Sequence, residues 1–461
     1  MAIVTALVVL YSGAIYWIYT GEDIRRFVGL GYTYVEPNWG YLVLLTLALA
    51  FMAMTLPRRI DHVSSFVLWL LFALVVVPGV QVTQYSGYLS PENGFIAASG
   101  LIGSFAIARL ITLRHRPPRF LGFALPPRIF WSCIALFSVF VFVVLQLTLG
   151  LELRFLNVLD VYEVRGEYNE KLLGASAAVS YLVGTQSNVV NPLIIARGIV
   201  TKNYAVIALG VLGQVLIYSA TGFKTILFSV PAVVLFSVIF IARGTPKGFD
   251  FSRRPKSAVF LWAPTALIVA CVVIDQLTNT FIWTSFFGRR FIVTPGLMTG
   301  IYVKYYSENP LALLDQSVLG PWVDSGYEFP PAQTIGLWVT GTTDSAMNSH
   351  LFADGFANFG WVGMAAAGVV LGIYLRLSDR AAVGLPPVVP SLLLIMLTIT
   401  LSNTSILTSM FSHGLVAAFM ILTIAPRDGW HPPPERRTWR EFGAALILRT
   451  KRPPQPVRRE L

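Results

Sequence analysis

Long runs of apolar residues recur along the whole chain and are separated by short polar segments. A helix needs about 20 apolar residues to cross a bilayer, and the runs are close to this length. Because they are continuous rather than alternating, they predict helices and not the strands of a closed barrel. Twelve spans are predicted, over residues 2–19, 41–56, 63–80, 94–113, 129–149, 174–196, 203–219, 224–242, 258–276, 356–376, 387–402 and 405–425.

Two of these predictions have alternatives. The last two spans are alternatively a single re-entrant unit. The first run lacks a basic segment before it and a small-residue cleavage site after it, so we predict a retained helix rather than a cleaved signal peptide.

The composition agrees with a protein built largely of membrane helices. Of the 461 residues, 55% are hydrophobic and only 12% are charged, whereas soluble domains carry roughly 25% charged residues. We therefore predict an all-α polytopic membrane protein. The two cysteines, Cys133 and Cys271, lie within apolar runs and lack the spacing of metal ligands, so neither a disulfide framework nor a metal site is expected.

The net charge of +11 is distributed unevenly, and this distribution predicts orientation rather than nucleic-acid binding. If the spans alternate from a cytoplasmic N-terminus, 25 of the 34 Lys and Arg residues fall on the cytoplasmic side. Because Lys and Arg concentrate in cytoplasmic loops, both termini are predicted to be cytoplasmic. The basic tail, 426–461, is interpreted as a lipid-surface anchor or a disordered segment.

This topology divides the chain into four parts. Residues 1–276 carry the first nine spans and an external loop, 150–173. Residues 277–355 form a second external segment, which is long and rich in aromatic residues. Disordered segments are poor in aromatic residues, so we expect a folded extracytoplasmic cap with short helices and the candidate active site. Residues 356–425 hold the last three spans, and 426–461 are the tail.

Four cationic residues on the predicted external side are candidates for binding an anion. "YEVRGEY" contains Arg165, "TGFKT" contains Lys224, and "FFGRRFIVTPG" contains Arg289 and Arg290. Lys and Arg usually concentrate on the cytoplasmic side, so their presence on the external side needs a reason. Binding of an anion is such a reason, because guanidinium groups match phosphate oxygens well. Alternatively, Arg165 belongs to a solvated loop helix, and Lys224 is a lysine that extends its ammonium group to the interface.

The stretch "TTDSAMNSHLFADGFANFGWVG" gathers polar side chains just before an apolar run. His350 is a candidate general base, because histidine titrates near neutral pH; Asp344 and Asp354 are the alternatives. Asn348 is a candidate for binding a sugar or orienting the histidine, and Tyr302 completes the substrate-binding candidates. A second interpretation is that His350 only caps the following helix. The sequence contains no GxxxxGK[ST], GxSxG, HExxH or CxxC motif.

With these residues in view, the chain resembles the Wzy-type polymerases of bacterial O-antigen, capsule and exopolysaccharide pathways. The resemblance lies in about a dozen helices with one dominant external segment before the last spans, in "NSHLFADGFANFGWVG", and in "YEVRGEY", "TGFKT" and "RRFIVTPG". It implies a glycosyltransferase C-like architecture in the bacterial inner membrane.

The resemblance also implies a reaction and its partners. Such enzymes transfer a glycan from undecaprenyl pyrophosphate to an incoming lipid-linked repeat unit, without metal or cofactor. The implied partners are undecaprenyl-pyrophosphate-linked glycans, membrane lipids and a chain-length co-polymerase, with no nucleic acid. Arg289, Arg290, Arg165 and Lys224 would bind pyrophosphate. Two alternatives stay open: an O-antigen ligase that uses the same donor, and a flippase or transporter for lipid-linked oligosaccharides.

Overall fold

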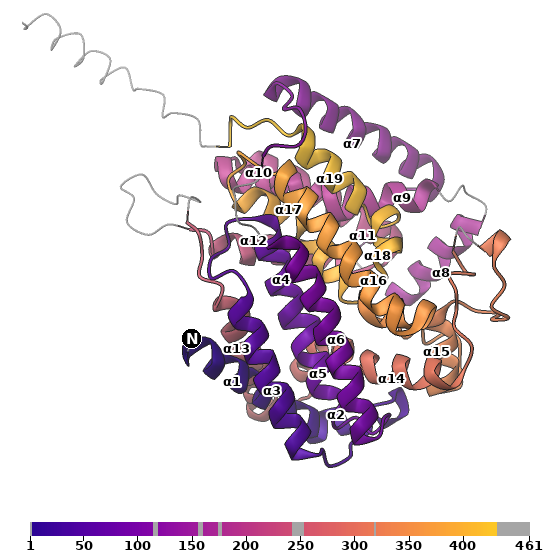
Figure 1. Cartoon of the computed structure of the whole chain (residues 1–461). Helices are drawn as coiled ribbons and strands as arrows, with labels where there is room; N and C mark the ends of the chain where they lie inside the picture. Colours follow the sequence, from indigo (N-terminus) through magenta and orange to yellow (C-terminus); the bar gives the residue numbers. More distant parts are fainter. Residues whose placement is uncertain are drawn as a thin grey trace, which may run out of the picture.

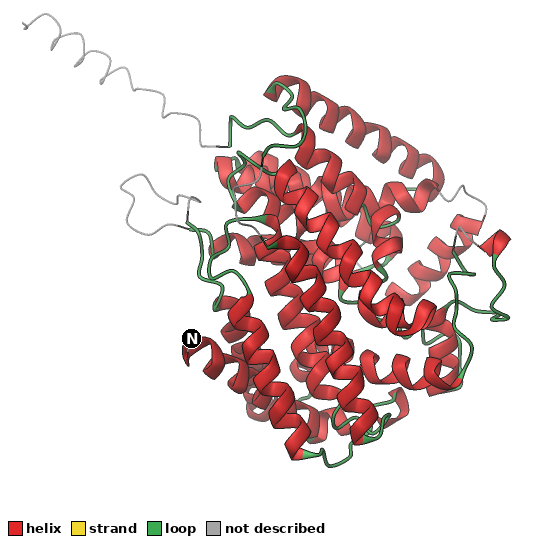
Figure 2. Ribbon diagram, in the orientation of Figure 1, coloured by secondary structure: helices red, strands yellow, loops and turns green. Residues whose placement is uncertain are grey.

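Helices begin and end close to the predicted spans in the computed structural model, which describes residues 2–113, 119–154, 160–173, 178–241, 253–317 and 320–430 (Figures 1 and 2). These residues contain no strand. The α-helices are α1 (Ala2–Thr20), α2 (Glu22–Arg25), α3 (Trp39–Thr55), α4 (Val63–Leu71), α5 (Val77–Val82), α6 (Pro91–Thr112), α7 (Pro127–Leu149), α8 (Asp160–Leu173), α9 (Ala178–Thr185), α10 (Asn191–Thr201), α11 (Tyr204–Thr221), α12 (Lys224–Val238), α13 (Val259–Thr278), α14 (Thr294–Glu308), α15 (Pro331–Thr340), α16 (Leu351–Ala381), α17 (Val388–Leu401), α18 (Ile406–Phe411) and α19 (Leu415–Ile424).

Seven helical stretches of the described chain are long and apolar enough to cross a membrane. They are α1, the continuous stretch Val63–Val82, α6, α7, α11, α13 and α16. Shorter apolar helices, α3, α12, α17 and α19, cover four more of the predicted spans. The protein is therefore consistent with a helical membrane protein, whereas the number of twelve crossings stays a prediction. The final predicted span is divided into α18 and α19 at Gly414, whose φ is +96°.

Three π-helical segments interrupt the helices, and each immediately precedes a residue pair that contains proline. They are η2 (Phe72–Val76), η3 (Gln186–Val190) and η4 (Thr284–Val293), followed by Pro78, Pro192 and Pro295. Proline lacks an N–H and its ring collides with the carbonyl four residues earlier. A wider turn before the proline relieves this collision and keeps the helix continuous.

The centre of the bundle is the stretch Val63–Val82, which is almost entirely buried. Helix α14 packs against its second half and also against α16. Every residue from Pro295 to Val303 is buried. The segment 277–355 is folded and contains short helices, and its helix α14 belongs to the core. Local small and apolar residues, "TPGLMTGIYV", explain this close packing.

Helices α6 and α16 run parallel along a seam of small residues. Gly368 lies so close to the carbonyl oxygen of Ser104 that a Cβ would collide with it. One turn later, Gly372 lies against Ala108 and Ile111. Small residues allow membrane helices to approach closely, and this seam fixes α16 against α6. Before the seam, α16 has a kink at Phe359 and Gly360, whose backbone angles are not helical.

A buried polar network joins η3 to α11 and α12. The side chain of Gln214 is completely buried. Its Nε2 donates to the Ser187 carbonyl at 2.7 Å and to the Ser229 hydroxyl at 2.5 Å, while its Oε1 accepts from Asn191 Nδ2 at 3.1 Å. Asn191 in turn accepts from Gln186 at 2.7 Å. Interhelical hydrogen bonds of this kind fix neighbouring helices in an apolar surrounding.

Candidate functional site

The segment η4 is anchored to the end of α13 by a buried carboxylate. Asp275 accepts from the backbone N–H groups of Thr284 at 2.6 Å and Trp283 at 3.1 Å. It therefore satisfies donors at the start of the segment that carries Arg289 and Arg290. Gly288, beside these arginines, packs on Ile18 of α1 with no room for a Cβ. Both arginines are thus held at the end of the α1–α13 pair.

Arg289 is held between aromatic rings rather than by a carboxylate. Its guanidinium carbon lies 4.0 Å from the ring centre of Phe27 and 5.5 Å from that of Tyr32. Its hydrogen bonds to the Tyr32 hydroxyl, at 3.4 Å, and to Ser285 Oγ, at 3.5 Å, are long. Its Nε is buried and has no partner among the described residues. This guanidinium therefore retains capacity to bind an anion.

Arg290 is exposed, and other exposed arginines lie at the same end of the molecule. The guanidinium carbon of Arg26 is 5.3 Å from the ring centre of Phe281, and that of Arg25 is 5.5 Å from the ring centre of Tyr34. Carboxylates are also present here, since α2 begins with Glu22 and Asp23. An exposed cationic region on an apolar helix bundle attracts anionic head groups.

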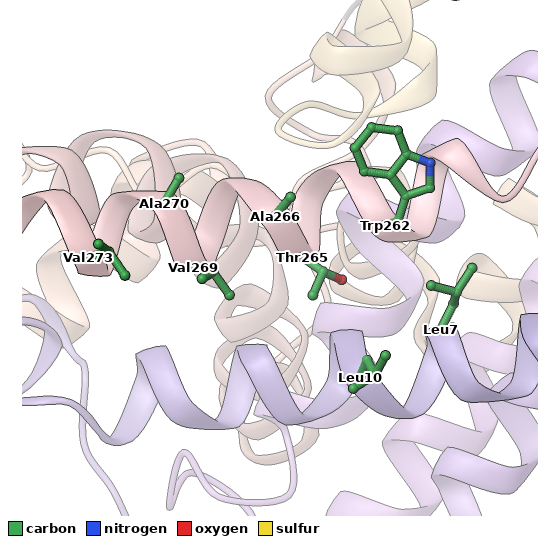
Figure 3. Close-up of a pocket in the computed structure, with 8 residues that line it drawn as sticks. All are labelled: Leu7, Leu10, Trp262, Thr265, Ala266, Val269, Ala270 and Val273. Atoms are coloured by element: carbon green, nitrogen blue, oxygen red, sulfur yellow. The ribbon is translucent and has the colours of Figure 1, made fainter.

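An apolar groove of about 520 Å³ lies between α1 and α13 (Figure 3). Leu7 and Leu10 line it from α1, and α13 lines it with Trp262, Thr265, Ala266, Val269, Ala270 and Val273. The lining of α13 covers about 16 Å at 1.5 Å per residue, roughly half of the ~30 Å hydrocarbon core. Val273 is two residues from Asp275, so the groove runs toward the end that carries the arginines. Its dimensions and lining suit one lipid chain.

Arg165 contacts the turn that immediately precedes Lys224. Arg165, on α8, donates from Nε to the carbonyl of Gly222 at 3.2 Å, and its guanidinium carbon lies 5.5 Å from the Phe223 ring centre. Lys224 begins α12 directly after this turn. Helix α8 packs on α7 and α11. Phe228, one turn after Lys224 on α12, has its ring centre 5.5 Å from that of Phe286 on η4, so the start of α12 lies beside the segment that carries Arg289 and Arg290.

His350 caps α16 and is completely buried. Its Nδ1 accepts from the backbone N–H of Ala353 at 3.3 Å, and its Nε2 lies 2.9 Å from Thr299 Oγ1. Since Nδ1 accepts, the proton of the neutral ring belongs on Nε2, which donates to Thr299. Burial lowers the pKa of His350 to about 3. Both nitrogens are engaged, so the geometry gives His350 the capping role, and its role as a base stays a prediction.

The other residues of this stretch differ in exposure. Asp344 and Asn348 are exposed, and Asp354 is partly exposed on the first turn of α16. Asp354 accepts from Asn358 Nδ2 at 3.4 Å. Tyr302 is buried and donates to the Met347 carbonyl at 2.8 Å, so it holds the end of this stretch against α14. Thr299 and Tyr302 of α14 thus hold His350 and Met347, whereas Asp344 and Asp354 are more accessible.

Sequence reasoning missed three residues near this stretch, namely Tyr306, Asp315 and Asn358. Asn358 is buried, and its Oδ1 accepts from the backbone N–H of Leu314 at 2.8 Å. Its i, i+4 spacing from Asp354 was visible in "DGFAN", but the distant turn that it holds was not. Asp315 and Tyr306 lie in segments whose polarity alone gives no sign of burial.

Comparisons with known proteins give no relative from which a function could be transferred. No family model, no curated protein and no solved structure matches the chain.

Proposed function

We propose that the protein is a membrane glycosyltransferase of the bacterial inner membrane that joins polyprenyl-pyrophosphate-linked oligosaccharide units into a surface polysaccharide. The observation that carries the proposal is the apolar groove between α1 and α13, which runs toward the end of the bundle where Arg26, Arg289 and Arg290 lie. A polyprenyl pyrophosphate combines a long apolar chain with an anionic head group. The groove suits the first part and the arginines suit the second.

The arginines would act on the leaving group. In the proposed step, the bond between the donor sugar's anomeric carbon and pyrophosphate breaks, and an acceptor hydroxyl oxygen forms the new glycosidic bond. Negative charge then accumulates on the departing pyrophosphate, and preorganised cations lower the energy of that charge. Arg290 is exposed to reach it, while Arg289 is fixed by its aromatic neighbours.

A carboxylate is the better candidate for the base than His350. The acceptor hydroxyl must lose its proton as the glycosidic bond forms, and the receiving atom must be within hydrogen-bond reach of the substrate. His350 is buried with both ring nitrogens engaged, whereas Asp354 is partly exposed and Asp344 is exposed. We propose that one of these carboxylates accepts the proton of the acceptor hydroxyl.

The test uses the purified full chain in proteoliposomes with undecaprenyl-pyrophosphate-linked repeat units as the sole substrate. A ladder of elongated glycans on a gel is the expected result. Arg290→Ala should lower the rate by at least tenfold, because a charge-assisted contact is worth about 1.5 to 3 kcal/mol. Arg128→Ala is the matched control, since Arg128 is also an exposed arginine but lies at the start of α7.

Three outcomes contradict parts of the proposal. No transfer to any acceptor rejects the transferase. In a parallel reaction to which a lipid A core is added, transfer to that core without elongation replaces the polymerase by a ligase. Equal rates for Arg290→Ala and Arg128→Ala remove Arg290 from the site.

A further inference from the structure

A buried tyrosine and a buried aspartate near the start of α16 each carry an oxygen atom without a protein partner. Tyr306 is 3% exposed and Asp315 is 9% exposed. Within the described part of the chain, neither the Tyr306 hydroxyl nor Asp315 Oδ1 has a hydrogen-bond partner. Unpaired buried polar atoms are uncommon because they lose their hydration without compensation. Two of them in one region leave hydrogen-bonding capacity for a ligand.

Tyr327 and Asp354 connect these two residues into one group, here called the Tyr306 cluster: Tyr306, Asp315, Tyr327 and Asp354. The ring centres of Tyr306 and Tyr327 are 6.0 Å apart. Burial, the neighbouring tyrosines and the Asp354 carboxylate all raise the pKa of Tyr306. Burial first, and Asp315 among other neighbours, raise the pKa of Tyr327. Both phenols therefore stay protonated. The Tyr327 hydroxyl donates to the Pro310 carbonyl at 2.6 Å, whereas the Tyr306 hydroxyl keeps its hydrogen for a ligand.

One wall of the cluster is a turn that is held in an unusual conformation. Leu313 and Leu314 have φ values of +51° and +63°, a region that β-carbon-bearing residues rarely adopt. Two hydrogen bonds hold the turn against α16, from Leu314 N–H to Asn358 at 2.8 Å and from Ala312 N–H to the Ala357 carbonyl at 2.9 Å. The turn leads directly into Asp315, whose Oδ2 accepts from Ser325. Asp315 is thus fixed, while its other oxygen has no partner among the described residues.

Aromatic rings extend from the cluster to the surface. The ring centre of Tyr305 is 5.0 Å from that of Tyr306 and 5.4 Å from that of Trp338, which is 43% exposed. Aromatic faces beside a few fixed hydroxyls and carboxylates match a sugar, which has apolar faces and several hydroxyl groups. A metal ion is less suited, since the described residues contain no group of three or more acidic, histidine or cysteine ligands.

We propose that the Tyr306 cluster binds a saccharide, whose hydroxyl groups pair with the Tyr306 hydroxyl and Asp315 Oδ1 while its ring stacks on the aromatic residues that lead to Trp338. The assignment of this saccharide to the acceptor glycan rests on the proposed function. The binding itself does not, because it requires neither a lipid donor nor transfer. Asp354, which belongs to the same cluster, would then lie beside the acceptor hydroxyl.

The test compares Tyr306→Phe and Asp315→Asn with a matched control, Tyr85→Phe. Tyr85 is also a fully buried tyrosine whose hydroxyl has no partner among the described residues, but it packs on Tyr16 and Tyr19 of α1. The full chain in nanodiscs is applied to an array of lipid-free bacterial surface oligosaccharides. We expect wild type and Tyr85→Phe to bind the same oligosaccharides, and the two cluster variants to bind them at least tenfold more weakly.

Thermal unfolding separates a lost contact from lost structure. Removing an unpaired buried hydroxyl removes no protein contact, so Tyr306→Phe should unfold at the wild-type temperature or above it. Weaker binding together with unchanged stability supports the proposal. Equal binding by wild type and Tyr306→Phe overturns it, and so does the absence of any oligosaccharide binding by wild type. Retained binding in a protein that shows no transfer would instead reject the transferase and leave the saccharide site in place.

Discussion

The buried histidine at the start of α16 predicts a specific dependence of stability on pH. His350 has an ordinary pKa of 6.5 in the unfolded chain, and burial lowers it to about 3 in the folded protein. Between these values the unfolded chain binds a proton that the folded protein does not. The free energy of unfolding therefore falls as the pH falls below 6.5, and the contribution of His350 is complete only above that pH.

The magnitude follows from the same two values. Each pH unit in this window changes the free energy of unfolding by about 1.4 kcal/mol, so a change from pH 7.5 to pH 5 costs about 2 kcal/mol through His350 alone. In His350→Asn, asparagine can still cap the helix but no longer titrates. Loss of the contact with Thr299 should cost about 1 to 3 kcal/mol at pH 7.5. Near pH 5 most of this difference from wild type should disappear.

Denaturant titration of the two proteins in detergent measures this difference. Tryptophan fluorescence reports unfolding, because Trp69 and Trp430 are buried in the folded protein and become exposed when it unfolds. Other groups titrate in both proteins alike, so only the difference between wild type and His350→Asn is interpreted. If the difference in the free energy of unfolding between the two proteins stays constant from pH 7.5 to pH 5, His350 binds protons equally in the folded and unfolded states. Its capping role would then be incorrect, and its role as a base would regain support.

Two further substitutions test the packing of the bundle. Gly368→Ala would force a Cβ against the Ser104 carbonyl and should lower the free energy of unfolding by about 1 to 3 kcal/mol. The control is Gly103→Ala, whose new Cβ has no neighbouring atom within 4 Å and should not lower it. Equal denaturation midpoints for the two variants would contradict the close packing of α6 against α16. Gln214→Leu leaves the buried Asn191 amide without its acceptor and should cost about 1 to 3 kcal/mol. Wild-type stability of this variant in the same titration would show that the network contributes little.

The helices were predictable because their signal is local. The run 63–80 predicts a membrane span, and the structure has a continuous helical stretch over Val63–Val82. Burial of α14 was not predictable in the same way, because it depends on the glycines that let Thr299 approach Gly79 across the bundle. The break between α18 and α19 falls at Ser412, His413 and Gly414, a polar triplet that the prediction of one span over 405–425 passed over.

The candidate site was predictable in composition but not in arrangement. The stretch around His350 was selected for its polar residues, and both interpretations of the histidine were available. Choosing between them required the positions of Thr299 and Ala353, which only the folded chain provides. The contact of Arg165 with the turn before Lys224, and that of α12 with η4, also depend on helix packing, which residue type does not encode.

The seam between α6 and α16 limits how the protein can move. Two helices whose backbones meet at Gly368 and again one turn later at Gly372 leave little side-chain volume between them there that could change rotamer to allow sliding. They should therefore travel as one rigid body in any cycle that admits a substrate and releases a product. The apolar side chains of α7, by contrast, are largely exposed at the edge of the bundle, so a change of helix packing is less restricted there than at the seam (Figure 1).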